Sequence, residues 1–271
     1  MLFDTAARTG HHGRRWAFPA LLGVSLFSGW LLCRGAAADL PNTIARVKPS
    51  VVAVGTVEPT RAPQASYMGT GFAVGDGSLV VTNAHVVPPI LDSEHREFLA
   101  VFSGTGKAAR MHPATPVATD LEHDLTLLRI GGKPLPPLTL GDSGSVREGD
   151  SAAFTGFPIG MVLGLYPVTQ HAIVSSITPI AIPVHSTQEL NSNMVRRLQT
   201  PFSVFQLDAI AYPGNSGSPL FDPESGKVIG VINAVFVKGT KENALSQPTG
   251  ISYAIPGNYV RALLRRAGQT R

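Results

Sequence analysis

The stretch Gly214-Asn215-Ser216-Gly217-Ser218-Pro219-Leu220 places one serine between two glycines, just before an apolar run. Only a glycine-flanked backbone makes so tight a turn without steric strain, so the sequence predicts a sharp turn at Ser216. Such a turn can direct the backbone N–H groups of Gly214 and Ser216, with Asn215 between them, into one small concavity. This backbone is therefore a candidate oxyanion site beside a serine hydroxyl.

Two segments earlier in the chain contain residues that could activate this hydroxyl. Val80–Val87 is a β-rich run that contains His85, and Asp124 opens the apolar run Leu125–Ile130. A serine hydroxyl is a weak nucleophile until an imidazole removes its proton, and a buried carboxylate orients that imidazole and stabilises its charge. His85, Asp124 and Ser216 are therefore the candidate catalytic residues. Asp120 and Glu122 are alternatives to Asp124, but both precede the apolar run.

These segments resemble the trypsin-like (chymotrypsin-fold) serine proteases of the HtrA/Deg type. The residues responsible are Thr82–Val87, Asp124–Leu128 and Gly214–Leu220, together with Gly156–Gly160 and Gly250–Pro256. The resemblance runs in order from about Ala45 to Ala267. It implies two perpendicular six-stranded antiparallel β-barrels, with His85 and Asp124 in the first, Ser216 in the second and a cleft between them.

The sequence departs from the family pattern in two places. Ser218 stands where the family usually has glycine, and because serine is small we expect it to fit. Bacterial members commonly carry C-terminal PDZ domains, and we expect none after the last predicted helix. The protease domain alone is the prediction.

The residue pattern independently favours an all-β fold. Gly 28 and Pro 22 are high counts for a helical protein, and short apolar runs recur between turn signals such as Asp76-Gly77. Examples of the predicted strands are Val51–Thr56, Gly71–Val74, Leu79–Thr82, Leu125–Ile130, Ala152–Thr155, His171–Ser175, Ser203–Leu207, Val228–Val235 and Ile251–Ala254. Helices are predicted only at Asn42–Lys48 and, as a short C-terminal helix, at Gly257–Ala267. We expect one domain over residues 39–271.

The first 38 residues are typical of a targeting segment. Arg14 and Arg15 precede the uncharged stretch 16–33, and the stretch is followed by an Ala-rich site ending at Ala38. Residues 1–38 are thus predicted to be a cleaved signal peptide, which makes the protein periplasmic or secreted. The uncharged stretch is also long enough to span a bilayer, so membrane association through an uncleaved anchor at residues 16–33 is the alternative.

Charge and composition exclude several function classes. Four of the 22 basic residues and one of the 18 acidic residues lie in residues 1–38, so the remainder is close to neutral and shows no basic face for nucleic acid. One cysteine excludes a disulfide framework, and His112, His171 and His185 lack metal-ligand spacing. We expect no metal and no cofactor. His123, beside Asp124, is expected to be a solvated loop residue.

The resemblance also indicates where a substrate side chain would bind. In this fold the residue six before the nucleophile, Ile210, lies at the base of the main pocket, and Asn233 and Ala234 would line its wall. A pocket without a buried carboxylate cannot compensate the desolvation of Lys or Arg. The prediction is endopeptidase cleavage of protein or peptide substrates after small or medium aliphatic residues.

Several alternatives stay open at the level of sequence. The polar stretch His185–Arg197 would be a regulatory loop, as in the family, or an idle surface insertion. A protease-like barrel that binds chains without cutting them, as a chaperone does, is the rival function, and an esterase is a third. The resemblance is compatible with a homotrimer.

Overall fold

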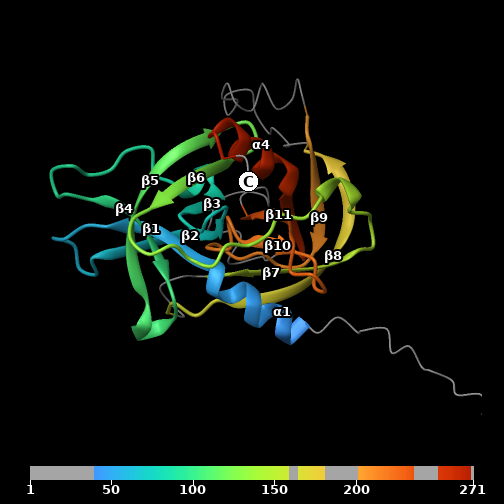
Figure 1. Cartoon of the computed structure of the whole chain (residues 1–271), viewed down its shortest axis with the longest axis horizontal. Helices are drawn as coiled ribbons and strands as arrows, with labels where there is room; N and C mark the ends of the chain where they lie inside the picture. Colours follow the sequence, from blue (N-terminus) through green and yellow to red (C-terminus); the bar gives the residue numbers. More distant parts are fainter. Residues whose placement is uncertain (1–39, 159–163, 181–200, 235–249, 270–271) are drawn as a thin grey trace, which may run out of the picture. The chain divides into compact units, whose positions relative to one another are not determined.

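The computed structural model describes residues 40–158, 164–180, 201–234 and 250–269, and all of them belong to one compact unit spanning residues 36–271 (Figure 1). The predicted signal peptide or anchor lies outside the described residues, as does the loop His185–Arg197. Within the described ranges, no helix has the length and apolar character needed to cross a bilayer.

Two closed antiparallel barrels of six strands form the body of the unit. In the first barrel the strands are hydrogen-bonded in the order β1-β2-β3-β6-β5-β4. Their bounds are β1 Val51–Val57, β2 Ala65–Val74, β3 Leu79–Asn83, β4 Phe98–Ser103, β5 Arg110–Asp120 and β6 Leu125–Ile130. The hairpin predicted at Asp76-Gly77 joins β2 to β3, where Gly77 adopts φ +88° and its N–H donates to Val74 O at 3.0 Å.

The second barrel repeats this arrangement, with strand order β10-β11-β12-β9-β8-β7. Its strands are β7 Ser151–Gly156, β8 Val168–Pro179, β9 Ser203–Asp208, β10 Pro219–Phe221, β11 Val228–Asn233 and β12 Ile251–Pro256. The prediction of an all-β fold with two six-stranded barrels is confirmed.

Helices lie at both ends of the described unit. Helix α1 is Leu40–Val47 and helix α4 is Gly257–Arg266, close to the two predicted helices. Val260, Leu263 and Leu264 of α4 are buried, as their helical spacing predicts. The described residues also contain four short 3₁₀ turns, and the one that matters for the site, η2, is Ala84–Val86 directly after β3.

Four apolar clusters hold the unit together, and two of them join the barrels. One cluster fills the first barrel around Val101 and Leu128, and another fills the second around Phe154 and Leu207. A third cluster packs first-barrel residues such as Leu127 against second-barrel residues and α4. The fourth joins the two barrels through residues of β1, β4, β7 and β10. The barrels therefore share buried surface as well as having interiors of their own.

Candidate active site

His85 lies in η2, the turn that leaves the first barrel at the end of β3. Its ring Nδ1 is 2.6 Å from Asp124 Oδ2, and its backbone N–H donates to Asp124 Oδ1 at 3.0 Å. Because an ionised carboxylate only accepts hydrogen bonds, this contact favours the tautomer with hydrogen on Nδ1. The Nε2 lone pair is then available to accept a proton.

Asp124 occupies the turn between β5 and β6 with an unusual backbone. Its φ is +53°, a left-handed conformation that aspartate tolerates better than most residues. The backbone N–H of Ala84 and the side-chain amide of Asn83 both donate to its carbonyl oxygen, each at 3.0 Å. The Asp124 side chain is 11% exposed, against 31% for His85. The carboxylate is thus held from several sides and shielded, while the imidazole reaches the surface.

The second barrel contributes to the same carboxylate through Asn233, the last residue of β11. This side chain is fully buried, and its Nδ2 donates to Asp124 Oδ2 at 2.6 Å. The oxygen that contacts the imidazole therefore also receives an amide hydrogen from across the barrel boundary. Such charge-assisted bonds fix the carboxylate more firmly than a single contact would.

Ser216 is joined to this group through the residue after Asn233. The backbone N–H of Ala234 donates to Ser216 Oγ at 3.3 Å. Asn233 therefore bonds the Asp124 carboxylate and the next residue, Ala234, bonds the Ser216 hydroxyl. Since Asp124 also contacts His85, all three predicted catalytic residues lie in one region. In the described part of the chain, no hydrogen bond joins the Ser216 hydroxyl directly to His85.

The predicted sharp turn is present around Ser216, and we call residues 212–218 the serine turn. Gly214 has φ +97° and Gly217 has φ +88°, both in the range that favours glycine. Asn215 N–H donates to Tyr212 O and Ser218 N–H to Asn215 O, so the turn closes on itself. The backbone N–H of Asn215, which lies between the two expected oxyanion donors, is thus already used within the turn. Gly214 N–H and Ser216 N–H have no protein acceptor among the described residues.

Of the predicted pocket residues, Ile210 and Ala234 are half-buried and Asn233 is fully buried. The backbone around Ile210 is fixed by Ser252 of β12, whose hydroxyl donates to Ala209 O and accepts from Ala211 N–H, each at 2.7 Å. The side chain of Asn233 is directed to Asp124. Residues 235–249, which continue from Ala234, lie outside the described residues.

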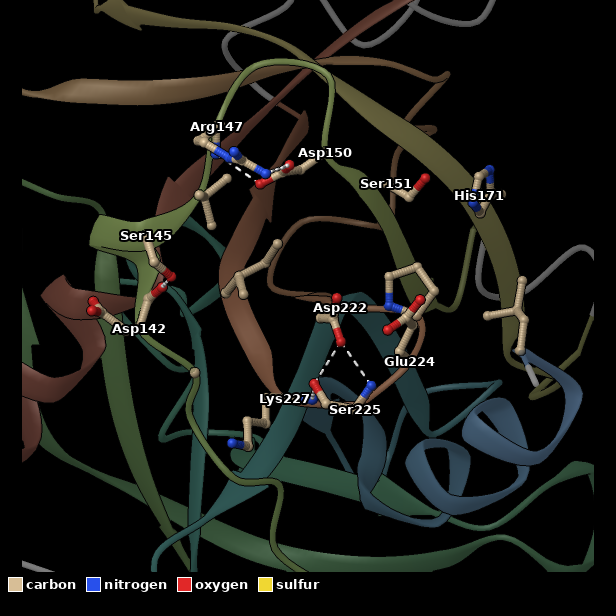
Figure 2. A pocket seen from close by; sticks show the side chains of 15 residues that line it. Asp142, Ser145, Arg147, Asp150, Ser151, His171, Asp222, Glu224, Ser225 and Lys227 are labelled. Carbon is tan, nitrogen blue, oxygen red and sulfur yellow. Dashed lines mark hydrogen bonds and ion pairs between the residues drawn. The ribbon is translucent and has the colours of Figure 1, made fainter. Parts of the chain in front are cut away.

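A pocket of about 880 Å³ opens elsewhere in the unit, between the β10–β11 turn, His171 of β8 and the segment that precedes β7 (Figure 2). None of the predicted catalytic or pocket residues lines it. Two of its charged side chains pair with each other, Arg147 with Asp150, and Asp222 accepts a hydrogen bond from the backbone of Ser225. This pocket is therefore separate from the candidate site.

The expectation for His123 was wrong. The side chain is 15% exposed, stacks on Tyr259 with ring centroids 3.8 Å apart, and its Nδ1 lies 2.9 Å from Asp120 Oδ2. Asp120 also pairs with Arg266 of α4. Burial raises the pKa of Asp120, but the hydrogen bonds from His123 and the pairing with Arg266 outweigh it and lower that pKa below its usual value. This cluster joins α4 to the turn that presents Asp124.

Sequence reasoning missed three contributions to the site. The amide of Asn233 supports Asp124, Ser252 fixes the backbone around Ile210, and Thr70 of β2 bonds the serine turn. Each is a polar residue in a strand at a buried position. Because buried polar groups are nearly always hydrogen-bonded, such a residue in an otherwise apolar run was the signal in the sequence that could have indicated a partner. Among the described residues, no group of acidic, histidine or cysteine side chains could hold a metal ion.

Comparisons with known proteins agree with this architecture. The sequence model of the trypsin-like peptidase domain matches residues 69–231, which include His85, Asp124 and Ser216. A probable periplasmic serine endoprotease, DegP-like, from Halomonas elongata is 30% identical over 189 residues, 70% of this chain and 32% of the relative. The mitochondrial serine protease HTRA2 of Drosophila willistoni is 32% identical over 203 residues, 75% of this chain and 39% of the relative.

A solved structure, the HtrA-type protease AlgW with tripeptide, is similar in fold. It aligns with a TM-score of 0.60 and 27% identity over 85% of this chain and 64% of that one. The chain spans about a third to two fifths of the length of the curated relatives named above. Because the family match covers more than half of the sequence and the barrels correspond, the chain belongs to the trypsin-like peptidase domain family and is of the HtrA type.

Proposed function

We propose that the chain is a serine endopeptidase that hydrolyses peptide bonds in exposed or unfolded protein segments. The observation that supports this most directly is the 2.6 Å contact between His85 Nδ1 and Asp124 Oδ2. Ser216 is linked to this pair by two neighbouring residues, because Asn233 donates to the Asp124 carboxylate and Ala234 N–H donates to Ser216 Oγ. The names of the relatives, which are serine proteases, support the same reaction.

In the proposed reaction the Ser216 hydroxyl attacks the scissile carbonyl carbon while His85 Nε2 accepts its proton. Asp124 stabilises the imidazolium that forms, and the amides of Gly214 and Ser216 bind the oxyanion of the tetrahedral intermediate. His85 then protonates the leaving amine as the carbon–nitrogen bond breaks. Water, deprotonated by His85, hydrolyses the acyl-enzyme and restores the serine. All these groups belong to the chain itself.

The first test is the reactivity of Ser216. A fluorophosphonate probe should label the wild-type chain, and Ser216→Ala should abolish both labelling and the cleavage of an unfolded protein substrate. Ser218→Ala, two residues away with no hydrogen bond from its hydroxyl within the described structure, is the matched control and should still be labelled. A wild-type chain that folds but is neither labelled nor active would contradict the proposal.

Substrate preference is the second test. Ile210 at the pocket base and the uncharged Ala234 support cleavage after Val, Ala or Leu, because neither side chain can compensate a buried cation. Profiling the cleavage sites in a peptide library measures this directly. Sites dominated by Lys or Arg before the cut would refute the assignment of Ile210.

The rival function is a protease-like binding or chaperone protein. The observation in its favour is that Ser216 Oγ accepts from Ala234 N–H and is not bonded to His85 in the described residues. Catalytic hydrogen bonds are often long or poorly aligned before substrate binds, so this contact is compatible with catalysis. An unlabelled chain that still prevents aggregation of an unfolded protein would favour the rival, and turnover of esters but not peptides would favour an esterase.

Export completes the proposal. The basic start and the uncharged stretch of residues 1–38, together with relatives described as periplasmic, support a periplasmic or secreted protein with a protease domain over residues 39–271. Mass spectrometry of the mature chain distinguishes a cleaved signal from an anchor at residues 16–33.

The oligomeric state and the loop are tested separately. Sedimentation of the same sample tests the homotrimer, and measuring turnover after deletion of residues 189–194 tests the regulatory loop.

A further inference from the structure

We propose that Thr70 is a positioning residue that fixes the serine turn of the second barrel from the first barrel. This inference rests on the proposed function, since it concerns the amides that would bind the oxyanion. Thr70 belongs to β2, is fully buried and lies far from Ser216 in sequence. It touches neither His85 nor Asp124 by any hydrogen bond that the described structure contains.

Thr70 holds the serine turn at two carbonyl groups. Its hydroxyl donates to Gly214 O at 2.6 Å, and its backbone N–H donates to Ser216 O at 2.8 Å. The same hydroxyl accepts from Phe157 N–H at 3.0 Å. A hydroxyl has a single hydrogen to donate, so the bond from Phe157 orients the oxygen while its hydrogen is committed to Gly214.

These bonds matter because the internal hydrogen bonds of the turn do not involve the carbonyl groups of Gly214 and Ser216. Gly214 has access to a much wider range of backbone angles than other residues, so the orientation of its peptide groups depends on external contacts. The Gly214 carbonyl and the Asn215 N–H belong to one planar peptide group, and both ends of this group are bonded, to Thr70 and to Tyr212 O. This peptide group lies in the chain between the N–H groups of Gly214 and Ser216, so fixing it limits how far those two amides can reorient.

The surroundings of Thr70 are built to allow so close an approach. A Cβ on Gly217 would lie 1.9 Å from Thr70 O and 2.6 Å from Thr82 Oγ1, and a Cβ on Gly156 would lie 3.0 Å from Thr70 Oγ1. Any side chain at either glycine would push the turn and Thr70 apart. The absence of a side chain at these two glycines therefore allows the serine turn to pack directly against β2.

Thr82 extends the support toward the imidazole. This buried residue of β3 donates from its hydroxyl to Thr70 O at 2.7 Å, and β3 leads directly into the turn that contains His85. One pair of neighbouring strands thus holds the serine turn and also presents the proposed base. Losing the Thr70 hydroxyl should disturb the oxyanion amides while leaving His85 and the substrate pocket in place.

The test compares Thr70→Val, which removes the hydroxyl and keeps the shape, with Thr70→Ser, which keeps the hydroxyl. Removing one oxyanion donor outright lowers kcat by about 10²–10³-fold, so a displaced turn should lower it by roughly 10–100-fold. We expect this loss for Thr70→Val with KM changed by less than about threefold, because uniform binding is untouched. Thr70→Ser should restore kcat to within about threefold of wild type.

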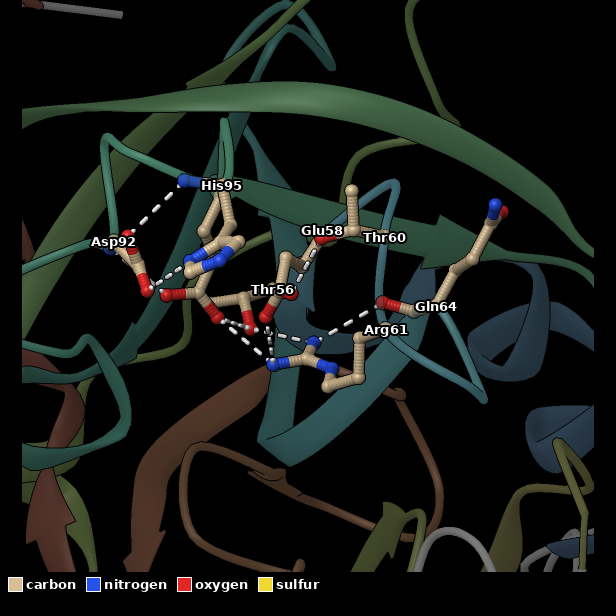
Figure 3. A network of polar contacts seen from close by, with 8 residues as sticks. Thr56, Glu58, Thr60, Arg61, Gln64, Asp92 and His95 are labelled. Atoms are coloured by element: carbon tan, nitrogen blue, oxygen red, sulfur yellow. Dashed lines mark hydrogen bonds and ion pairs between the residues drawn. The ribbon is translucent and has the colours of Figure 1, made fainter.

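Thr56→Val is the matched control. Thr56 is a buried threonine of β1 whose hydroxyl also makes a 2.6 Å bond, to Glu97 in the network around Arg61 (Figure 3). Among the described residues, its side chain makes no hydrogen bond to the serine turn. The Thr56→Val variant should have a lower free energy of unfolding, measured with denaturant, and yet keep the wild-type kcat. Equal loss of kcat in Thr56→Val and Thr70→Val would mean that general destabilisation is responsible, which would overturn the inference.

Other outcomes also decide the matter. Thr70→Val with wild-type kcat, or Thr70→Ser that is as slow as Thr70→Val, would overturn the role of the hydroxyl while the proposed function stands. If Thr70→Val does not fold, Thr70→Ala removes the same hydroxyl together with the γ-methyl group, adds no bulk, and is read in the same way. A folded wild-type chain that no fluorophosphonate labels would overturn the proposed function and this inference together.

Discussion

At the scale of single residues, the site depends on polar groups placed where a strand or turn would otherwise be apolar. The chemistry of a serine turn, a histidine and an aspartate could be read from the sequence because their local patterns are distinctive. The roles of Asn233 and Thr70 could not, since each is one polar residue in a buried strand, and its partner lies in a turn distant in sequence. Only the closed barrels bring those partners together.

Asn233 provides the prediction at this scale. Removing its side chain in Asn233→Ala takes an amide hydrogen away from the Asp124 oxygen that contacts His85, so the carboxylate should hold the imidazole less firmly. A hydrogen bond to a charged group contributes about 1.5–3 kcal/mol. If roughly half of this is lost in the transition state, kcat should fall by about 4- to 12-fold, as measured with a peptide substrate.

Asn83→Ala is the matched control for Asn233→Ala. The Asn83 amide bonds the backbone carbonyl of Asp124 and not its carboxylate, so its loss should lower the stability more than kcat. Two outcomes would contradict the prediction: an equal loss of kcat in both variants, or wild-type kcat in Asn233→Ala. Either would mean that the hydrogen bond from Asn233 to the Asp124 carboxylate does not contribute to kcat.

At the scale of elements, most strands follow their sequence pattern, and one that does not has an identifiable reason. The run Leu125–Ile130 matches β6 residue for residue. Strand β5, Arg110–Asp120, was not among the strands named from the sequence, and Pro113 and Pro116 argue against a strand there because proline cannot donate to a ladder. The register shifts between Pro116 and Ala118, so the second proline falls at an irregularity of the ladder.

The contact between α4 and the β5–β6 turn gives the prediction for an element. Asp120 is 6% exposed, bonds His123 and pairs with Arg266, so Asp120→Asn should lower the free energy of unfolding by about 1–3 kcal/mol near pH 7. The pKa of Asp120 lies below its usual value of 3.8 in the folded chain. Its contribution is therefore complete above that value and is lost as the pH falls through the lower folded pKa.

Urea unfolding of wild type and Asp120→Asn over a pH series measures this difference. The gap between the two chains should stay constant at neutral pH and close only below the usual carboxylate range. Asp76→Asn is the control, because Asp76 also has a lowered pKa but bonds Ser78 in an exposed turn, where solvent screening makes the effect small. A gap that is already absent at pH 7 would show that the pairing with Arg266 does not stabilise α4.

At the scale of the whole described unit, two barrels of the same strand order are joined through shared apolar clusters and through the candidate site. The cluster around Leu127 includes residues of both barrels and of α4. Thr70 and Asn233 add polar bonds across the same boundary. The resemblance implied that each barrel supplies part of the site, but the extent of the shared core was not predictable, because a buried run in a strand does not reveal which neighbour covers it.

Shared burial predicts that the two barrels unfold together. Leu128 is fully buried inside the first barrel, in a cluster that contains no second-barrel residue, and Leu128→Ala should lower the free energy of unfolding by about 2–5 kcal/mol. Hydrogen exchange should then show the same loss of protection for the amides of β9 in the second barrel as for those of β3 in the first. Ile90→Ala, at a residue that is 84% exposed, should change neither strand. Loss of protection confined to the first barrel would mean that the barrels unfold separately, and that the site is assembled from two independently stable halves.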